Sequence, residues 1–180
     1  PYCEGSGTAS VTFAAGASGG VFSSTAGLII DSGTGEIDLN TSSPGIYTVE
    51  NNIVASGGCA PAVATTSVEI IVQDDATFTY SGTTFCLSGS NPVANITGTP
   101  GGNFTINNGG TIDVSTGEVD LVGSGINSFT VTYTTLGTCP DVETFDIQIT
   151  SAPDATFSYT GTPYCEGSGT ASVTFAAGAS

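Results

Sequence analysis

Ile30–Leu39 reads IDSGTGEIDL, and 82 positions later Ile112–Leu121 reads IDVSTGEVDL. The shared pattern is I-D-x-x-T-G-E-(I/V)-D-L, in which apolar residues alternate with polar ones around a short Thr-Gly segment. Such alternation is typical of strands with one buried face, and glycine supplies the positive φ that a short turn needs. We therefore expect the same β-hairpin twice, once in each half of the chain.

The two ends of the chain carry a longer repeat. Pro1–Ser18, PYCEGSGTASVTFAAGAS, returns letter for letter as Pro163–Ser180, so the sequence has a period of 162 residues. A fixed period of this kind predicts a repeat architecture. The chain is therefore expected to be a window on a longer tandem array.

The two repeats together predict how the chain divides. Asp75–Phe78 and Asp154–Phe157 both read DATF, 79 positions apart. Each long period therefore holds two diverged modules of roughly 80 residues. The first strand of module A is expected before residue 1, where the repeat places a counterpart of Ala155–Tyr159. The predicted boundaries are module A at residues 1–74, module B at 75–152, and the start of the next module A at 153–180.

Short alternating segments, separated by Gly, Asn and Pro, fill module B. In Ser128–Thr134, for example, Phe129, Val131 and Tyr133 share one face. The pattern predicts an all-β fold of tandem immunoglobulin-like antiparallel β-sandwich modules, each with one disulfide. The expected strands of module B are Thr77–Tyr80, Pro92–Gly98, Gly102–Asn107, Thr111–Val114, Glu118–Leu121, Ser128–Thr134 and Glu143–Thr150.

The charge balance excludes several classes of function. Sixteen Asp and Glu residues stand against no Lys, no Arg and no His. Without cations the chain cannot neutralise phosphates, which excludes nucleic acid and anionic membrane surfaces as partners. Without His or Lys it lacks the usual bases for catalysis near neutral pH, so we expect no enzyme. No apolar run approaches the ~20 residues that a membrane-spanning helix requires, so no membrane insertion is expected.

Five cysteines are the strongest chemical signal in the chain. Cys3 and Cys59 fall in module A, Cys86 and Cys139 fall in module B, and Cys165 repeats Cys3. The two separations, 56 and 53 residues, are nearly equal. We therefore predict Cys3–Cys59 and Cys86–Cys139 disulfides in an oxidising extracellular setting, with the partner of Cys165 outside this sequence. A metal site or a redox pair is the alternative, but the chain lacks CxxC spacing and His ligands.

Acidic residues mark both expected junctions between modules. Asp74 and Asp75 lie at the first junction and Asp154 lies at the second. Calcium binds six to eight oxygen ligands, and carboxylates between tandem modules supply some of them. A calcium site at these three residues is one reading, and simple solvation of the linkers is the other. No other cofactor is expected.

Aromatic residues raise the question of glycan binding. Tyr47, Tyr80, Phe129 and Tyr133 each occupy an apolar position of an alternating segment. Aromatic rings can stack on sugars, but alternation places these four side chains on the buried face. We therefore expect them in the core of the modules.

Three stretches of module A resemble a known family of bacterial surface repeats. They are Gly27–Asp31, Thr34–Leu39 and Ser43–Val49, which together read GLIID, TGEIDL and SPGIYTV. They are similar to the immunoglobulin-like repeats of giant cell-surface adhesins, gliding-type proteins and filament proteins of Bacteroidota, which usually leave the cell by the type IX route. Module B departs from the pattern, because Gly125–Phe129 replaces the Pro-Gly-x-Tyr step. The resemblance implies a β-sandwich at the bacterial cell surface and identifies no ligand.

Three functions remain open at this point. In the first, the modules are a structural repeat of a long extracellular fibre or adhesin stalk, and they act as a mechanical spacer whose partners are neighbouring repeats of the same chain. In the second, copies of the chain assemble into an extracellular multi-chain filament. In the third, the modules bind surface glycans. Unpaired edge strands would favour the filament, and an aromatic cleft would favour glycan binding.

Overall fold

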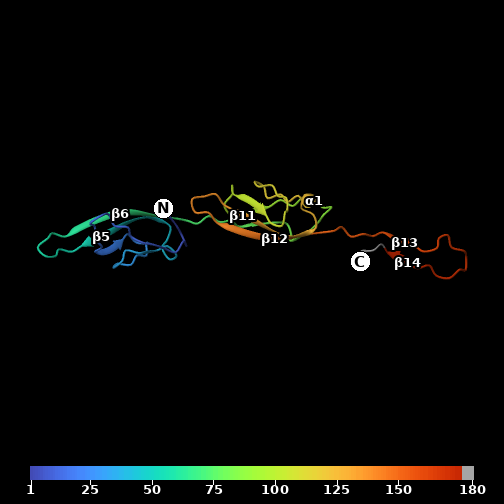
Figure 1. The fold of residues 1–180 in the computed structure, drawn as a ribbon, viewed down its shortest axis with the longest axis horizontal. Helices are drawn as coiled ribbons and strands as arrows, with labels where there is room; N and C mark the ends of the chain where they lie inside the picture. Colours follow the sequence, from blue (N-terminus) through green and yellow to red (C-terminus); the bar gives the residue numbers. More distant parts are fainter. Residues whose placement is uncertain (176–180) are drawn as a thin grey trace. The chain divides into compact units, whose positions relative to one another are not determined.

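The computed structural model describes residues 1–175, and in that part the chain is almost entirely β-structure (Figure 1). This confirms the predicted all-β fold class. The one helix among the described residues, α1 (Leu121–Ser124), is far too short to cross a membrane. The strands are β1 (Tyr2–Cys3), β2 (Thr8–Ala9), β3 (Val21–Ser24), β4 (Ile37–Asp38), β5 (Gly45–Ile53), β6 (Ala62–Ile71), β7 (Phe78–Thr79), β8 (Thr84–Cys86), β9 (Asn95–Ile96), β10 (Asn103–Ile106), β11 (Asn127–Thr134), β12 (Val142–Thr150), β13 (Phe157–Tyr159) and β14 (Val173–Phe175).

The chain folds into two compact units that do not follow the predicted module boundaries. The first unit contains Pro1–Thr79, Ile96–Asn103 and Thr132–Glu143. The second contains Tyr80–Asn95, Phe104–Val131 and the chain from Thr144 on. The first unit therefore joins all of predicted module A to one end of predicted module B. The boundaries at residues 74 and 152 stay a prediction based on the sequence repeat.

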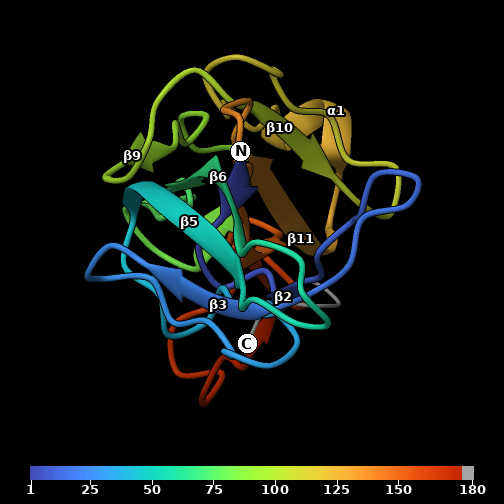
Figure 2. The ribbon, with the colours of Figure 1, turned by 90° about the vertical axis from the view of Figure 1, so that its left-hand side faces the viewer.

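Module A is a β-sandwich. One sheet has the strand order β1-β6-β5-β3, of which β3, β5 and β6 are labelled in Figure 2, and the other consists of β2 and β4. Its core gathers side chains from both sheets: Ala9, Phe22, Leu28, Ile37, Leu39, Tyr47, Val49 and Ile70. Along β5 the alternation is clear, because Tyr47 and Val49 are buried while Ile46 is 73% exposed. The apolar periodicity of the sequence thus sets which face of each strand enters the core.

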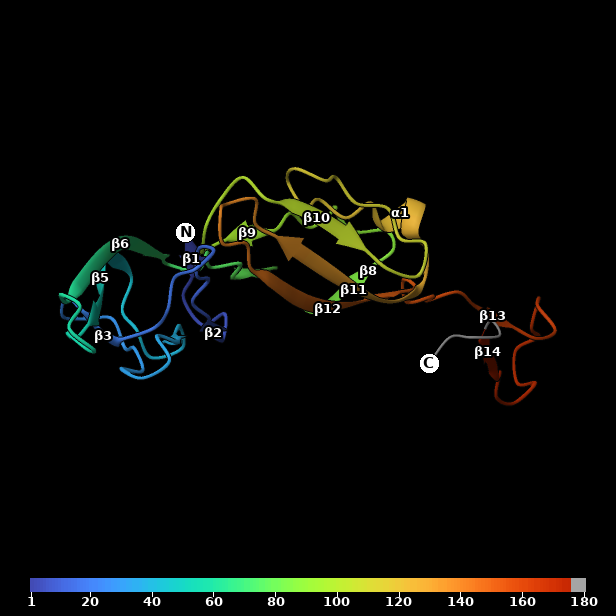
Figure 3. The same ribbon diagram turned by 60° about the vertical axis from the view of Figure 1, so that its left-hand side comes forward.

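Predicted module B repeats the four-stranded sheet, while its two-stranded sheet pairs β7 with β9. Its four-stranded sheet has the order β10-β11-β12-β8, shown in Figure 3. Phe129, Val131 and Tyr133 on β11 are all buried, as the alternation predicts. Phe104 on β10 and Leu121 at the start of α1 are buried as well. The aromatic side chains that the sequence assigns to the core are therefore in the core.

The repeated I-D-x-x-T-G-E stretches form the same turn. Asp31 Oδ1 accepts hydrogen bonds from the backbone N–H of Thr34 at 2.7 Å and of Gly33 at 2.9 Å. Asp113 Oδ1 accepts the equivalent bonds from Thr116 at 2.8 Å and Ser115 at 2.9 Å. These bonds, led by the backbone N–H of Thr34 and of Thr116, hold the pKa of both aspartates below its usual value. The residues of each turn therefore correspond at an offset of 82.

The segments on either side of each turn pair less than the expected hairpin requires. In each turn they form a single β-bridge, Ile30 with Ile37 in one and Ile112 with Val119 in the other. In module B the second flank ends early, because Asp120 caps α1 by accepting from the N–H groups of Val122 and Gly123. A side chain that caps a helix competes with strand pairing, which the alternating pattern alone does not reveal.

Two short edge strands were not expected from the sequence. β1 runs parallel to β6, with Cys3 opposite Ile71, and β8 runs parallel to β12, with Cys86 opposite Thr150. In both cases, the backbone N–H of the residue after the cysteine donates to the carbonyl of the residue opposite the cysteine: Glu4 to Ile71 at 2.9 Å and Leu87 to Thr150 at 2.8 Å. Cys3 and Cys86 therefore occupy equivalent positions. In the four-stranded sheet of module A, the other pairs, β3–β5 and β5–β6, are antiparallel.

Candidate functional site

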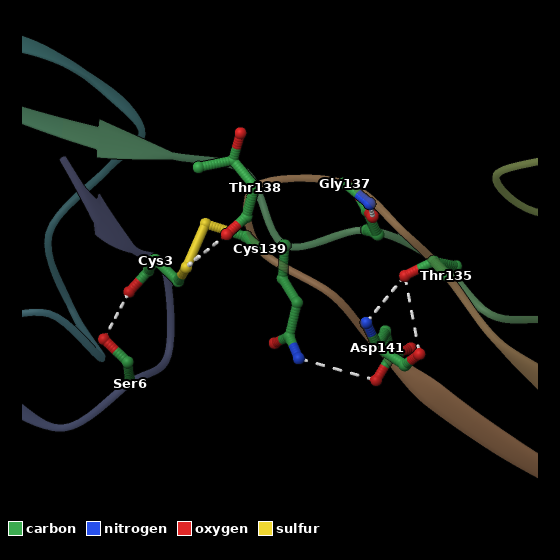
Figure 4. Close-up of a disulfide and its surroundings, with 9 residues drawn as sticks. Cys3, Ser6, Thr135, Gly137, Thr138, Cys139 and Asp141 are labelled. Carbon is green, nitrogen blue, oxygen red and sulfur yellow. Dashed lines mark hydrogen bonds between the residues drawn. A yellow bond between two sulfur atoms is a disulfide. The ribbon is translucent and has the colours of Figure 1, made fainter. Parts of the chain in front are cut away.

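A disulfide joins the start of module A to a loop of module B, and both cysteines lie in the first compact unit. Cys3 is the last residue of β1, and Cys139 lies in the connection between β11 and β12 (Figure 4). Their Cα atoms are 5.4 Å apart, and Cys139 is only 2% exposed. The bridge closes a loop with a sequence separation of 136 residues.

The predicted pairings Cys3–Cys59 and Cys86–Cys139 are therefore wrong. Cys3 lies opposite Ile71, at the end of β6, whereas Cys59 precedes the beginning of that strand. β6 has ten residues, which at a rise of ~3.3 Å per residue separates its ends by about 30 Å. A disulfide requires Cα atoms within about 7 Å, so the two cysteines of module A lie too far apart. The nearly equal spacings show that the cysteines of the two modules occupy equivalent positions. They do not show which cysteines form a disulfide with each other.

Hydrogen bonds from Asp74 connect the linker to the same loop. The backbone N–H of Asp74 donates to the carbonyl of Cys139 at 2.9 Å. Asp74 Oδ2 in turn accepts from the backbone N–H of Gly137 at 3.0 Å. We call the linker 73–77, the loop 135–141 and Cys3 together the junction.

Asp141 is the second anchor of the junction. Its Oδ2 accepts from the backbone N–H of Ala76 at 3.1 Å, and its Oδ1 accepts from Gln73 Nε2 at 3.4 Å. Asp141 is held in place by Thr135, whose buried hydroxyl accepts from the Asp141 N–H at 2.8 Å. Neither Asp141 nor Thr135 was expected from the sequence, and the position of Asp141 two residues after Cys139 was the available signal.

The predicted calcium residues have structural partners in the fold. Asp74 bonds Gly137 as described, while Asp75 Oδ1 accepts from the N–H of Thr77 at 2.9 Å and also from its hydroxyl. Asp154 Oδ1 accepts from the N–H of Thr156 at 2.8 Å. Among residues 1–175, no three acidic or cysteine side chains gather closely enough to hold a metal ion. Calcium at these aspartates stays a prediction.

Asp75 and Asp154 have the same local structural role. Bonds from the following threonine, led by its hydroxyl, lower the pKa of each carboxyl. Each aspartate thereby fixes the chain where it enters a strand, β7 in one case and β13 in the other. The two D-A-T-F segments, 79 positions apart, therefore lead into their strands with the same local structure.

Three cysteines of the described chain have no disulfide. Cys59 and Cys165 are exposed, and Cys86 is half-buried. A hydrogen bond with the Ser88 hydroxyl, at 3.2 Å, lowers the pKa of the Cys86 thiol. Cys86 thus has a larger thiolate fraction at neutral pH than an ordinary cysteine, and the thiolate is the reactive form.

Replacing Asp141 with alanine should loosen the junction. The change leaves the N–H of Ala76, which is 0% exposed, without its acceptor, and an unpaired buried donor costs about 1–3 kcal/mol. We expect faster amide hydrogen exchange at Ala76 and Asp74. Asp141→Asn is the matched control, since the amide oxygen can still accept. Unchanged exchange in Asp141→Ala would show that the carboxylate does not hold the linker.

Comparisons with known proteins find solved structures at low similarity. No protein-family model matches the sequence, and no curated protein sequence matches it. A SusE-like surface-located polysaccharide-binding protein from the heparin utilisation locus of Bacteroides thetaiotaomicron is similar in structure, with 15% identity and a TM-score of 0.40 over 88% of this chain and 34% of that one.

Two animal proteins are also similar. They are repeats EC22–24 of mouse cadherin-23 (15% identity, TM-score 0.31, 73% of this chain and 53% of that one) and the insect immune protein hemolin (13% identity, TM-score 0.30, 67% and 33%). The chain spans less than two thirds of the length of each of these three structures.

Proposed function

We propose that the chain is a load-bearing structural repeat of a long extracellular fibre or adhesin stalk. The observation that carries this proposal is the Cys3–Cys139 bridge. It links β1 of one predicted module to the loop that precedes β12 of the next, so tension can pass between them without stretching the core of module A. The hydrogen bonds of Asp74 and Asp141 add a second, non-covalent tie at the same place.

The chemistry of the chain supports an extracellular location. Stable structural disulfides persist in oxidising compartments. Sixteen acidic residues and no cation keep copies of a glycine-rich β-protein apart in solution. Within this proposal the neighbouring repeats are the principal partners.

Burial of the four aromatic residues considered for sugar stacking favours a spacer over a glycan-binding module. Tyr47, Tyr80, Phe129 and Tyr133 are at most 7% exposed, so their ring faces are not available for stacking on a sugar. The tyrosine hydroxyls are also engaged internally: Tyr47 donates to Ser43 O and Tyr80 to Gly117 O, both at 2.6 Å.

Two measurements test this proposal. Immunogold labelling with antibodies against residues 1–162 should decorate intact cells that produce the protein, at a distance from the cell envelope. The oxidised 180-residue chain should bind no member of a glycan array. Labelling that requires permeabilised cells would overturn the extracellular role, and saturable binding of one glycan class would replace the spacer with an adhesive module.

A further inference from the structure

Loop lengths disfavour the disulfide that the structure contains. Closing a flexible loop costs entropy that grows with the logarithm of its length. In an unfolded chain, the contact across 136 residues between Cys3 and Cys139 is therefore about fourfold less probable than the contact across 56 residues between Cys3 and Cys59. It is roughly twelvefold less probable than the contact across 26 residues between Cys139 and Cys165. Contacts of the folded chain, and not loop length, therefore determine this pair.

Backbone pairing fixes Cys3 at the end of β6 from which the linker leaves. β1 is parallel to β6 with Cys3 opposite Ile71, and the N–H of Glu4 donates to the Ile71 carbonyl at 2.9 Å. Asp74 follows Ile71 by three residues. The last residue of β6 therefore holds Cys3 close to the point at which Asp74 enters the linker.

Asp74 holds the backbone on both sides of Thr138. Its N–H donates to the Cys139 carbonyl at 2.9 Å, and its Oδ2 accepts from the N–H of Gly137 at 3.0 Å. Glycine is required at position 137, because a Cβ atom there would overlap the Asp74 carboxylate. These two bonds fix the backbone of Cys139 relative to the end of β6.

Asp141 fixes the other side of the same loop. Its carboxylate accepts from the N–H of Ala76 at 3.1 Å and from Gln73 Nε2 at 3.4 Å. The ends of the loop are joined to each other, because the N–H of Thr135 donates to the Asp141 carbonyl at 3.0 Å and the N–H of Asp141 donates to the Thr135 hydroxyl at 2.8 Å. None of these bonds involves a sulfur atom, so the loop can dock on the linker without the disulfide.

The other cysteines lack this arrangement. Cys59 lies beyond the opposite end of β6, and its N–H bonds only within its own loop, to the carbonyl of Ser56 at 3.0 Å. Asp141 lies two residues after Cys139, but Pro61 lies two residues after Cys59 and has no carboxylate. Cys86 and Cys165 belong to the second compact unit. Only the loop with Cys139 therefore carries the side chain that anchors it to the linker.

We propose that Asp74 and Asp141 are positioning residues for the formation of the Cys3–Cys139 disulfide. They dock the loop 135–141 on the linker 73–77 while both cysteines are still thiols, and the docked loop presents Cys139 to Cys3. The hydrogen bonds of the junction therefore form first, and the covalent bond follows. This role rests on the bridge itself and does not depend on the spacer function.

Oxidised glutathione serves as the oxidant with balanced chemistry. Cys3 is half-buried while Cys139 is 2% exposed, so glutathione reacts first at Cys3. The Cys3 thiolate attacks the glutathione disulfide, forms a mixed disulfide and releases one glutathione thiolate. The Cys139 thiolate then attacks the Cys3 sulfur, completes the S–S bond and releases the second glutathione. Two protein thiols lose two electrons, and one oxidised glutathione becomes two reduced molecules that take up the two protons.

The docked loop accelerates the second step of this reaction. A displacement within the chain is fast when the attacking group is held close to its target. When the loop is not docked, the mixed disulfide at Cys3 persists, and Cys59 competes with Cys139 for it with the advantage of the shorter loop. The carboxylates therefore affect both the rate of oxidation and the identity of its product.

Hydrogen exchange in a chain without the bond tests whether docking comes first. In the full chain with Cys3→Ala/Cys139→Ala, and in the reduced wild-type chain, the Ala76 amide should exchange slowly because Asp141 still accepts from it. Adding Asp141→Ala to the double variant should make this exchange fast, and adding Asp141→Asn should not. Fast exchange at Ala76 in both chains that lack the disulfide would overturn the proposal, because docking would then depend on the bond.

Oxidation of the reduced chain tests whether the carboxylates direct the pairing. Reduced chains are mixed with oxidised glutathione without denaturant, sampled over time, alkylated and cleaved by a Glu-specific protease. Each cysteine then falls on its own peptide: Pro1–Glu4, Asn51–Glu69, Ile70–Glu118, Val119–Glu143 and Thr144–Glu166.

The wild type should yield the Cys3–Cys139 pair with little glutathione left on Cys3. In Asp74→Ala/Asp141→Ala, the mixed disulfide at Cys3 should accumulate. The ratio of Cys3–Cys59 to Cys3–Cys139 should then rise toward the roughly fourfold value that loop length sets. Asp74→Asn/Asp141→Asn is the matched control and should oxidise as the wild type does, since its amide oxygens can accept the same bonds. Slow amide exchange in β5 and β11 shows for each variant that both sandwiches are folded.

The products of the alanine variant decide the outcome. A folded Asp74→Ala/Asp141→Ala chain that forms the Cys3–Cys139 pair as fast and as completely as the wild type would overturn the proposal. So would an asparagine variant that behaves as the alanine variant does, because hydrogen bonding by these two side chains would then not be what places Cys139 beside Cys3.

Discussion

Pulling the oxidised chain by its two ends should leave most of it unextended. The Cys3–Cys139 bridge lies in the path of the force, and the residues between the two cysteines are shielded from tension. The sequence separation of 136 residues corresponds to a hidden length of roughly 450–490 Å, at ~3.3–3.6 Å per extended residue. Single-molecule force spectroscopy should therefore show this additional contour length only after reduction.

The size of the increment distinguishes the possible bridges. Cys3→Ser should behave in oxidising buffer as the wild type does after reduction. Cys165→Ser is the matched control and should keep the length hidden. Bridges within each module would instead release two increments, of 56 and 53 residues. Such a pair of increments, or no effect of reduction, would contradict a disulfide that carries tension between the modules.

Removing the Tyr80 side chain should destabilise module B strongly. Tyr80→Ala empties a slot walled by Phe85 and Phe145 and leaves the carbonyl of buried Gly117 without its donor. Loss of a buried aromatic side chain costs about 3–5 kcal/mol. Tyr80→Phe keeps the ring, so it should cost only about 0.5–1.5 kcal/mol for the hydrogen bond.

The repeat provides an internal control for this experiment. Tyr159 is the sequence counterpart of Tyr80 but is 48% exposed. Tyr159→Ala should change the free energy of unfolding by no more than about 0.5 kcal/mol in dilute solution. Urea denaturation of both variants measures the difference directly. Equal losses would mean that the slot around Tyr80 does not stabilise module B.

Local features of the fold could be predicted from the sequence. The two I-D-x-x-T-G-E turns form as expected, because an aspartate, a threonine and a glycine determine such a turn within five residues. The buried faces of β5 and β11 also follow the alternation, since a strand with one wet face requires it. The repeat itself indicated which residues occupy equivalent positions.

Features that depend on distant parts of the chain could not be predicted. Cys59 and Cys139 occupy equivalent sequence positions, but this does not determine the disulfide partner of either one. The partner depends on the end of the strand at which each cysteine's loop lies. The parallel strands β1 and β8 are only two and three residues long, too short for a periodic signal. The role of Asp141 likewise depends on the backbone of Ala76, 65 positions away.

Disulfide mapping under non-reducing conditions tests the central claim most directly. The chain has no Lys or Arg for trypsin, but its glutamates allow cleavage by a Glu-specific protease after free thiols are alkylated. We expect Pro1–Glu4 linked to Val119–Glu143, which reports the Cys3–Cys139 bond, and alkylated Cys59, Cys86 and Cys165. Pro1–Glu4 linked to Asn51–Glu69 would instead report a Cys3–Cys59 bond, and the covalent tie between the modules would then not exist.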